Sequence, residues 1–264
     1  MVRVRLLGKL AVELDGVQLV LPAPSARLLA CLSVTDGPQD RAGLAGRLWA
    51  DADAAAARAN LRTALWSLRK ALGDSALLTT RTTVALDPEV VSVDLDEFRE
   101  LAGRDDPAAA DARYAGELLP MFHDEWVLTA RQELLARRSA TLEALTEQAA
   151  RVGDHARAAR WARSRCELDP LDEPAHRALL GHLLAAGDRA AATVVGTRFE
   201  ARLRTELGVD PSAGTRAVLA QIRGGAATGV VVPGRELTPM FGRRAELAVL
   251  TTAWTAARAG RGGV

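Results

Sequence analysis

The sequence predicts a mainly α-helical protein with an α+β N-terminal part. Two observations lead to this fold class. Residues 2–21 alternate apolar and polar side chains around Asp15-Gly16, as the strands and turn of a small antiparallel sheet do. Residues 107–223 instead repeat apolar side chains at helical spacing. A length of 264 residues with 48% hydrophobic residues is sufficient for two domains with cores of their own.

Three helices are expected after the first sheet. Ser25 and Asp40 are the expected N-caps of the first two, because a short polar side chain can accept a hydrogen bond from the first turn. The third helix is expected from about Ala55 to Leu72, and Gly73 ends it. A polar two-stranded hairpin over 77–86 follows. Sheet, three helices and hairpin is the order of a winged helix-turn-helix with an N-terminal sheet.

The rest of the chain is expected to be an all-α, tetratricopeptide-like helical repeat domain. The sequence Gly-Asp-His-Ala-Arg-Ala at 153–158 recurs as Gly-Asp-Arg-Ala-Ala-Ala at 187–192. The offset of 34 residues equals the tetratricopeptide period. Apolar side chains such as Val194, Phe199 and Leu207 fall at core spacing, so we expect them to pack between helices rather than line a ligand site.

The third helix carries the candidate functional face. From Ala54 to Gly73 it has four basic residues and no acidic one, whereas a helix that only faces solvent usually mixes charges. An acid-free basic face suits the DNA major groove; the alternative is a solvated basic face on a structural helix, and this helix alone favours neither. The candidate DNA-binding residues on this helix are Arg58, Asn60, Arg62, Thr63, Trp66, Ser67, Arg69 and Lys70.

The hairpin and the local charge favour DNA binding. Thr80, Arg81 and Thr82 at the hairpin turn are candidate contacts, because hydroxyl groups and an arginine suit phosphate or the minor groove. Residues 1–86 carry 11 basic and 7 acidic groups, a net charge of +4, against +1 for the whole chain.

Catalytic, metal-binding and membrane functions find little support. The 4 histidines are dispersed and neither cysteine lies beside one, so no metal site and no catalytic residue is predicted. There is no nucleophile elbow and no phosphate loop. Cys31 and Cys166 are expected to be buried, reduced thiols. No window suits a membrane span and the N-terminus lacks an apolar signal core, which favours a cytoplasmic protein.

Several motifs resemble the SARP family (Streptomyces antibiotic regulatory proteins) over nearly the whole chain. Residues 59–72, Ala-Asn-Leu-Arg-Thr-Ala-Leu-Trp-Ser-Leu-Arg-Lys-Ala-Leu, are similar to the recognition helix of the family's OmpR-type winged helix. Residues 117–120, 168–173 and 206–212 are similar to its bacterial transcriptional activation domain. Residues 241–247, Phe-Gly-Arg-Arg-Ala-Glu-Leu, are similar to the start of the ATPase domain in large members.

The resemblance implies four segments. These are an OmpR-type winged-helix DNA-binding domain (1–95), a bacterial transcriptional activation domain with tetratricopeptide-like helices (96–225), a linker (226–240) and the truncated start of an NTPase domain (241–264). The hairpin departs from the family pattern, because it lacks the usual glycine and aromatic residue.

The resemblance also implies a function. The expected protein is a transcription activator and not an enzyme. It would bind direct repeats of double-stranded DNA near the promoters of antibiotic biosynthesis genes and recruit RNA polymerase holoenzyme, and a homodimer on DNA is compatible with this. No cofactor is expected in this fragment, since ATP or ADP would belong to a downstream domain. The expected location is the nucleoid in the cytoplasm. The alternative is a helical-repeat interaction module whose winged helix binds protein rather than DNA.

Overall fold

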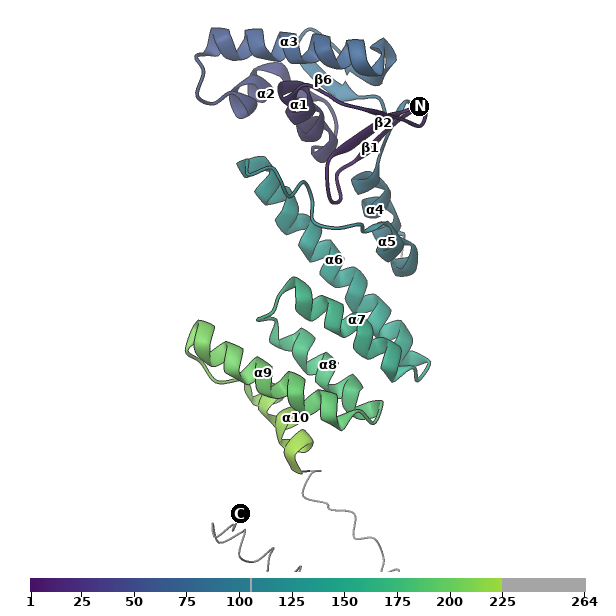
Figure 1. Ribbon diagram of the computed structural model, residues 1–264, viewed down its shortest axis with the longest axis vertical. Helices are drawn as coiled ribbons and strands as arrows, with labels where there is room; N and C mark the ends of the chain where they lie inside the picture. The colour runs from purple at the N-terminus through teal and green to yellow at the C-terminus, as the bar shows by residue number, and fades with distance from the viewer. Residues whose placement is uncertain (105, 225–264) are drawn as a thin grey trace, which may run out of the picture. The chain divides into compact units, whose positions relative to one another are not determined.

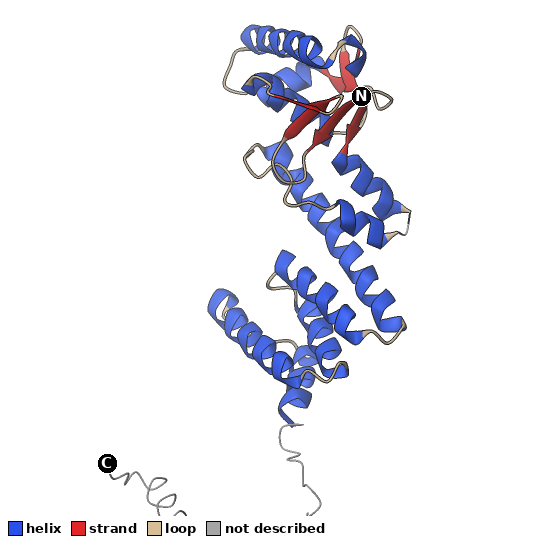
Figure 2. Ribbon diagram, turned by 45° about the vertical axis from the view of Figure 1, so that its right-hand side comes forward, coloured by secondary structure: helices blue, strands red, loops and turns tan. Residues whose placement is uncertain are grey.

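A computed structural model describes residues 1–104 and 106–224. The expected linker at 226–240 and the expected NTPase start at 241–264 therefore lie outside the described residues. Within the described part, strands and helices mix near the N-terminus and the rest is helical (Figures 1 and 2). This confirms the predicted fold class.

A four-stranded sheet opens the chain, in the order β3-β2-β1-β7. Its strands are β1 (Val2–Arg5), β2 (Ala11–Leu14), β3 (Val17–Leu19) and β7 (Val91–Val93). β1, β2 and β3 are antiparallel, as predicted. β7 pairs with β1 in parallel. This strand is not among the predicted ones, because its partner lies so far away along the chain.

Three helices and a small second sheet complete the winged helix-turn-helix. The helices are α1 (Ala23–Val34), α2 (Arg41–Leu48) and α3 (Ala54–Leu72), and a 3-10 turn, η1, covers Asp74–Ala76. The second sheet has the order β4-β6-β5, formed by β4 (Gln39–Asp40), β6 (Thr83–Leu86) and β5 (Leu77–Thr79). β5 and β6 are the predicted hairpin, hereafter called the wing.

The expected ends of α2 and α3 are confirmed. The Asp40 carboxylate accepts a hydrogen bond from the Gly43 N–H at 2.7 Å and caps α2. Gly73 ends α3 with φ of 92°, a backbone conformation that glycine adopts without strain.

The expected cap of α1 is wrong. α1 begins at Ala23, before Ser25, and Pro22 occupies its N-cap. Prolines here already hold the φ of a first helical turn, so the helix starts without a hydroxyl cap. Ser25 is buried instead, and its hydroxyl donates to the Ala64 carbonyl of α3 at 3.4 Å. Ser25 therefore connects two helices of the winged helix-turn-helix.

In residues 94–224, apart from residue 105, the structure has seven helices after the wing and β7. They are α4 (Asp94–Gly103), α5 (Pro107–Arg113), α6 (Glu125–Arg151), α7 (His155–Leu168), α8 (Glu173–Ala185), α9 (Arg189–Leu207) and α10 (Ala213–Gly224). The two Gly-Asp turns of the predicted repeat are equivalent. Asp154 and Asp188 each accept an N–H of the following helix at 2.9 Å, which confirms the repeat geometry.

α9 buries fewer apolar side chains than its sequence predicts. It buries Ala192, Gly196, Phe199 and Leu203 along one stripe. Val194 is 50% exposed and Leu207 is 54% exposed, so their expected core positions are wrong. Val194 lies about 200° around the helix from Gly196, on the side away from the packed stripe.

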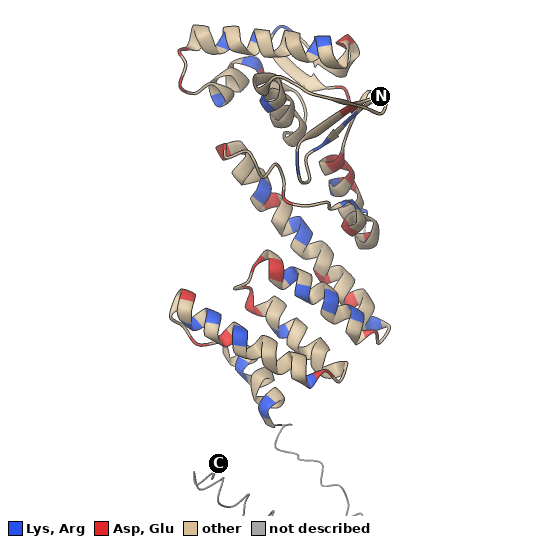
Figure 3. Cartoon of the chain, viewed as in Figure 1, with Lys and Arg blue, Asp and Glu red and all other residues tan. Residues whose placement is uncertain are grey.

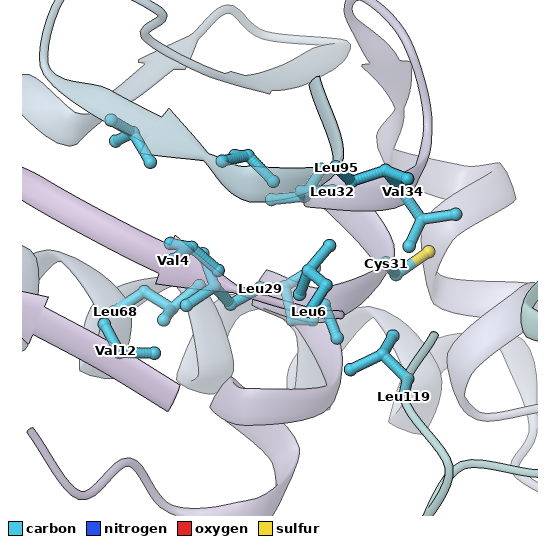
Figure 4. Packing of buried hydrophobic residues seen from close by; sticks show 14 of the residues in the cluster. Val4, Leu6, Val12, Leu29, Cys31, Leu32, Val34, Leu68, Leu95 and Leu119 are labelled. Carbon is cyan, nitrogen blue, oxygen red and sulfur yellow. The ribbon is translucent and has the colours of Figure 1, made fainter. Parts of the chain in front are cut away.

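The N-terminal core continues into the helical part. Leu118 and Leu119 lie in the non-helical segment before α6, and Leu7 and Leu118 form an antiparallel bridge. Leu119 packs with residues of the first sheet and α1 in one buried cluster that also takes in Leu134 of α6 (Figure 4). The segment boundary expected after residue 95 stays a prediction, but one core spans both sides of it.

Two histidine contacts in the helical part depend on neutral imidazole. The Nδ1 atoms of His155 and His182 are 3.4 Å apart. Burial lowers the pKa of His182, and the charge of His155 lowers it further. Burial also lowers the pKa of His176, whose ring stacks on Phe199 with centroids 3.8 Å apart. The folded protein therefore binds protons at His176 and His182 less readily than the unfolded chain does.

We expect the helical part to lose stability below about pH 6.5, the ordinary pKa of histidine. The sign follows because the unfolded chain binds more protons than the folded one there, so unfolding becomes easier as the pH falls. The loss continues until the pH is below the lowered pKa values of the folded state. Thermal unfolding of His182→Gln between pH 7.5 and pH 5 should show a shallower decrease of Tm than the parent chain. The exposed His123→Gln variant is the control, and an unchanged pH profile in His182→Gln would contradict this assignment.

Candidate nucleic-acid interface

The outer face of α3 is free in the described part of the chain. Its inner face is fixed by buried leucines, among them Leu61, Leu65 and Leu68. In Figures 1 and 2, α3 lies at the edge of the N-terminal part with no described element over its outer side. The Asp53 carboxylate accepts the N–H groups of Ala56 and Ala55, and these bonds hold the pKa of Asp53 below its ordinary value. The start of the helix is thus fixed by a charged cap.

Basic side chains alone occupy the charged positions of α3. Figure 3 shows Lys and Arg along the helix and acidic residues only beyond its ends. Arg58, Arg62 and Lys70 are exposed, and none of them forms an ion pair with a described carboxylate. Their charges are therefore available to an anionic partner.

Trp66 and Lys70 form one exposed unit on this face. The Trp66 side chain is 63% exposed, although a large apolar ring on a helix surface ordinarily packs against protein. The Lys70 Nζ lies 5.4 Å from the centroid of the Trp66 ring, within cation–π range. Thr63 lies one turn earlier, is exposed, and donates to the Ala59 carbonyl at 3.2 Å.

Arg69 differs from the other arginines of α3. It is half-buried, and its guanidinium donates to the Thr79 hydroxyl of β5 at 2.6 Å. This bond ties the last turn of α3 to the wing. From the sequence Arg69 is a predicted DNA contact, and its bond to Thr79 could not be predicted, because no spacing rule connects a helix to a strand ten residues away.

The tip of the wing is closed by its own hydrogen bonds. The Thr80 hydroxyl lies 2.7 Å from that of Thr83 and accepts the N–H groups of Thr82 and Thr83. Arg81 is exposed at the tip, whereas the Thr80 hydroxyl is already engaged within the turn. The geometry leaves Arg81 as the charged group that the wing presents.

Asn60 and Ser67 flank the face on its other side. Asn60 is exposed and Ser67 is half-buried, seven residues and two helical turns apart. The structure thus brings the predicted helix residues onto one surface, with Arg69 directed to the wing and Ser67 partly covered.

Other kinds of site are not found in the described residues. Within 1–104 and 106–224, no three side chains of the metal-ligating types lie close enough together to hold an ion. No helix in that part of the chain is both long and apolar enough to cross a bilayer. Cys31 and Cys166 are free and buried, as predicted, and burial raises the pKa of the Cys166 thiol to about 12, which makes it unreactive.

Residues 93–223 match the family model of the bacterial transcriptional activator domain. This segment is a bacterial transcriptional activator domain. The match confirms the SARP-like assignment made from the motifs, and the family is of a transcriptional-regulator type. In the structure the matched segment begins at Val93, the last residue of β7, and runs through α4 into α10.

The fold of the activator domain together with the winged helix also occurs in a solved structure. The Mycobacterium tuberculosis EmbR chain, in complex with a low affinity phosphopeptide, matches with a TM-score of 0.66 and 20% sequence identity. The match covers 85% of this chain and 65% of that one, so the chain spans less than two thirds of the EmbR chain. At this identity the likeness establishes the fold. Comparison with curated proteins gave no match.

Proposed function

We propose that the protein is a sequence-specific, DNA-binding transcription activator. The observation that carries the proposal is the outer face of α3, where Arg58, Arg62, Trp66 and Lys70 are exposed with no acid among them. A helix of this kind fits the major groove, where arginine reaches guanine edges and phosphates. Arg81 on the wing supplies a further cation toward the backbone.

The remaining parts of the proposal rest on the SARP resemblance and the activator domain. The activator would bind direct repeats near promoters of antibiotic biosynthesis genes, recruit RNA polymerase holoenzyme and pair as a homodimer on adjacent repeats. It would work in the cytoplasm at the nucleoid, without enzymatic activity and without a cofactor in these residues. ATP or ADP would be bound only by a domain downstream.

In vitro selection on a randomised duplex pool at fixed salt tests this proposal. We expect recovery of a direct repeat whose half-sites are spaced by about one helical turn, 10–10.5 base pairs. The Arg62→Ala variant should fail to enrich the same repeat, and Arg137→Ala, an exposed arginine of α6, should enrich it normally. If the protein retained the DNA pool at low salt but enriched no sequence, the outer face of α3 would be only a non-specific electrostatic patch. A salt-insensitive complex with a protein, and no retention of DNA, would favour the interaction-module alternative.

A further inference from the structure

The crest of α3, meaning the side chains that point directly away from its buried side, is apolar over two turns. At about 100° per residue, Ala59, Thr63 and Trp66 lie within about 30° of this direction, and Lys70 ends the row toward the C-terminus. The Thr63 hydroxyl is bonded to the Ala59 carbonyl of the same helix. Its methyl group is therefore the part of the Thr63 side chain that is left to meet a partner.

The arginines of α3 lie on one flank of this crest. Arg58, Arg62 and Arg69 are turned from the crest by about 70° to 110°, all to the same side. The bond from Arg69 to the Thr79 hydroxyl identifies this flank as the one next to the wing, where Arg81 is exposed. In a major groove, the arginine flank and the wing would lie toward the phosphates of one strand, and the crest would point at the base edges.

We propose that the crest of α3 recognises thymine through its 5-methyl group. This inference rests on the proposed function and names the base that the helix selects. The thymine methyl is the apolar group that base edges present in the major groove, and apolar side chains recognise it by contact. The Trp66 side chain is 63% exposed, so its ring surface is available to cover a methyl group. Thr63, one turn earlier and also exposed, extends the same apolar surface.

A protein partner fits this face less well than duplex DNA does. Arg58, Arg62 and Lys70 are exposed and form no ion pair with a described carboxylate. The Lys70 Nζ also lies 5.4 Å from the centroid of the Trp66 ring, so a cation stands beside the apolar contact itself. Duplex DNA carries phosphates along the groove edges and thymine methyl groups on the groove floor. It therefore matches both the charged flank and the apolar crest.

Replacing thymine with uracil tests the proposal, because this change removes the methyl group and keeps every hydrogen bond of the base pair. In vitro selection with the full chain supplies the operator duplex, and each of its thymines is then replaced in turn by uracil. We expect at least one position in each half-site where the Kd rises about fourfold, the effect of one buried methyl group. Uracil at a thymine outside the half-sites is the control and should leave the Kd unchanged.

Two variants of the chain assign the contact to the crest. In Trp66→Ala, the thymine and uracil duplexes should bind equally well at the affected position, because the methyl group has lost its partner. Thr63→Ser removes a methyl group, keeps the hydroxyl that bonds Ala59, and should reduce the uracil effect. Arg137→Ala in α6 is the control and should retain the effect in full. Because Thr63 and Trp66 are exposed, unchanged thermal unfolding midpoints verify folding.

Two results would overturn this inference alone. These are an operator that binds equally well with uracil at every position, and a uracil effect that persists in full in Trp66→Ala. An operator that requires Arg62 but no thymine methyl group would still support the proposed function, so the two failures are distinguishable. If no sequence is enriched, both fail together. A salt-insensitive complex with a protein that Trp66→Ala abolishes, without retention of DNA, would make the crest a protein-docking face instead.

Discussion

Replacing Arg131 with alanine should lower the free energy of unfolding by about 3 kcal/mol, more than any other change of a charged residue that we consider. Arg131 lies in α6 with its side chain only 13% exposed. Its guanidinium donates to the carbonyls of Leu118, at 2.7 Å, and Phe122, at 2.8 Å, and also to that of Leu119. Alanine would leave these partly buried carbonyls without a donor, and an unsatisfied buried acceptor costs far more than a bond exchanged with water.

The position of Arg131 in the fold increases the effect of losing its hydrogen bonds. Leu119 N–H donates to the Leu6 carbonyl and Gly8 N–H to that of Glu117, so the segment held by Arg131 joins the first sheet to α6. Urea unfolding measures the change as a shift of the midpoint at constant slope. Arg137→Ala, an exposed arginine on the same helix, is the control and should stay within about 0.5 kcal/mol of the parent. A comparably small change in Arg131→Ala would show that the segment is held by its apolar side chains alone.

Arg62→Ala and Arg69→Ala should weaken DNA binding in two distinguishable ways. Arg62 is exposed without a partner, so we expect it to contact the DNA directly. Its loss should raise the Kd by about 5- to 150-fold if it reads a base, and a lost phosphate contact should lower the salt slope by about 0.9. Arg69 is engaged with Thr79, so we expect it to position the wing. Arg69→Ala should raise the Kd and leave the salt slope unchanged.

A double-mutant cycle separates positioning from contact. Thr79→Val should reproduce the effect of Arg69→Ala, and the double variant should bind no more weakly than either single variant, because both remove the same bond. The measurement is a series of Kd values over a range of salt concentrations, with Arg137→Ala as the unaffected control. A reduced salt slope in Arg69→Ala would assign that residue to the phosphates instead.

The elements could largely be predicted because they depend on local chemistry. Asp40 and Gly73 end helices through hydrogen bonds and dihedral angles that involve only their near neighbours. The face of α3 could be deduced for the same reason, since the spacing of Leu61, Leu65 and Leu68 fixes which side is buried and leaves Arg62 and Trp66 outside. The wrong cap at Ser25 shows the limit, because its hydroxyl found a partner in another helix.

The sequence by itself determined the order of the elements, the repeat of α7 and α9 and the acid-free basic face on α3. Periodicity, turn residues and charge are properties of neighbouring residues, so packing against the rest of the chain does not change them. Only the tertiary structure decided that Arg69 bonds the wing and that Arg131 secures the segment between the first sheet and α6. Each of these depends on atoms that are brought together by packing between elements, and no local spacing specifies which carbonyl, hydroxyl or ring a side chain will meet.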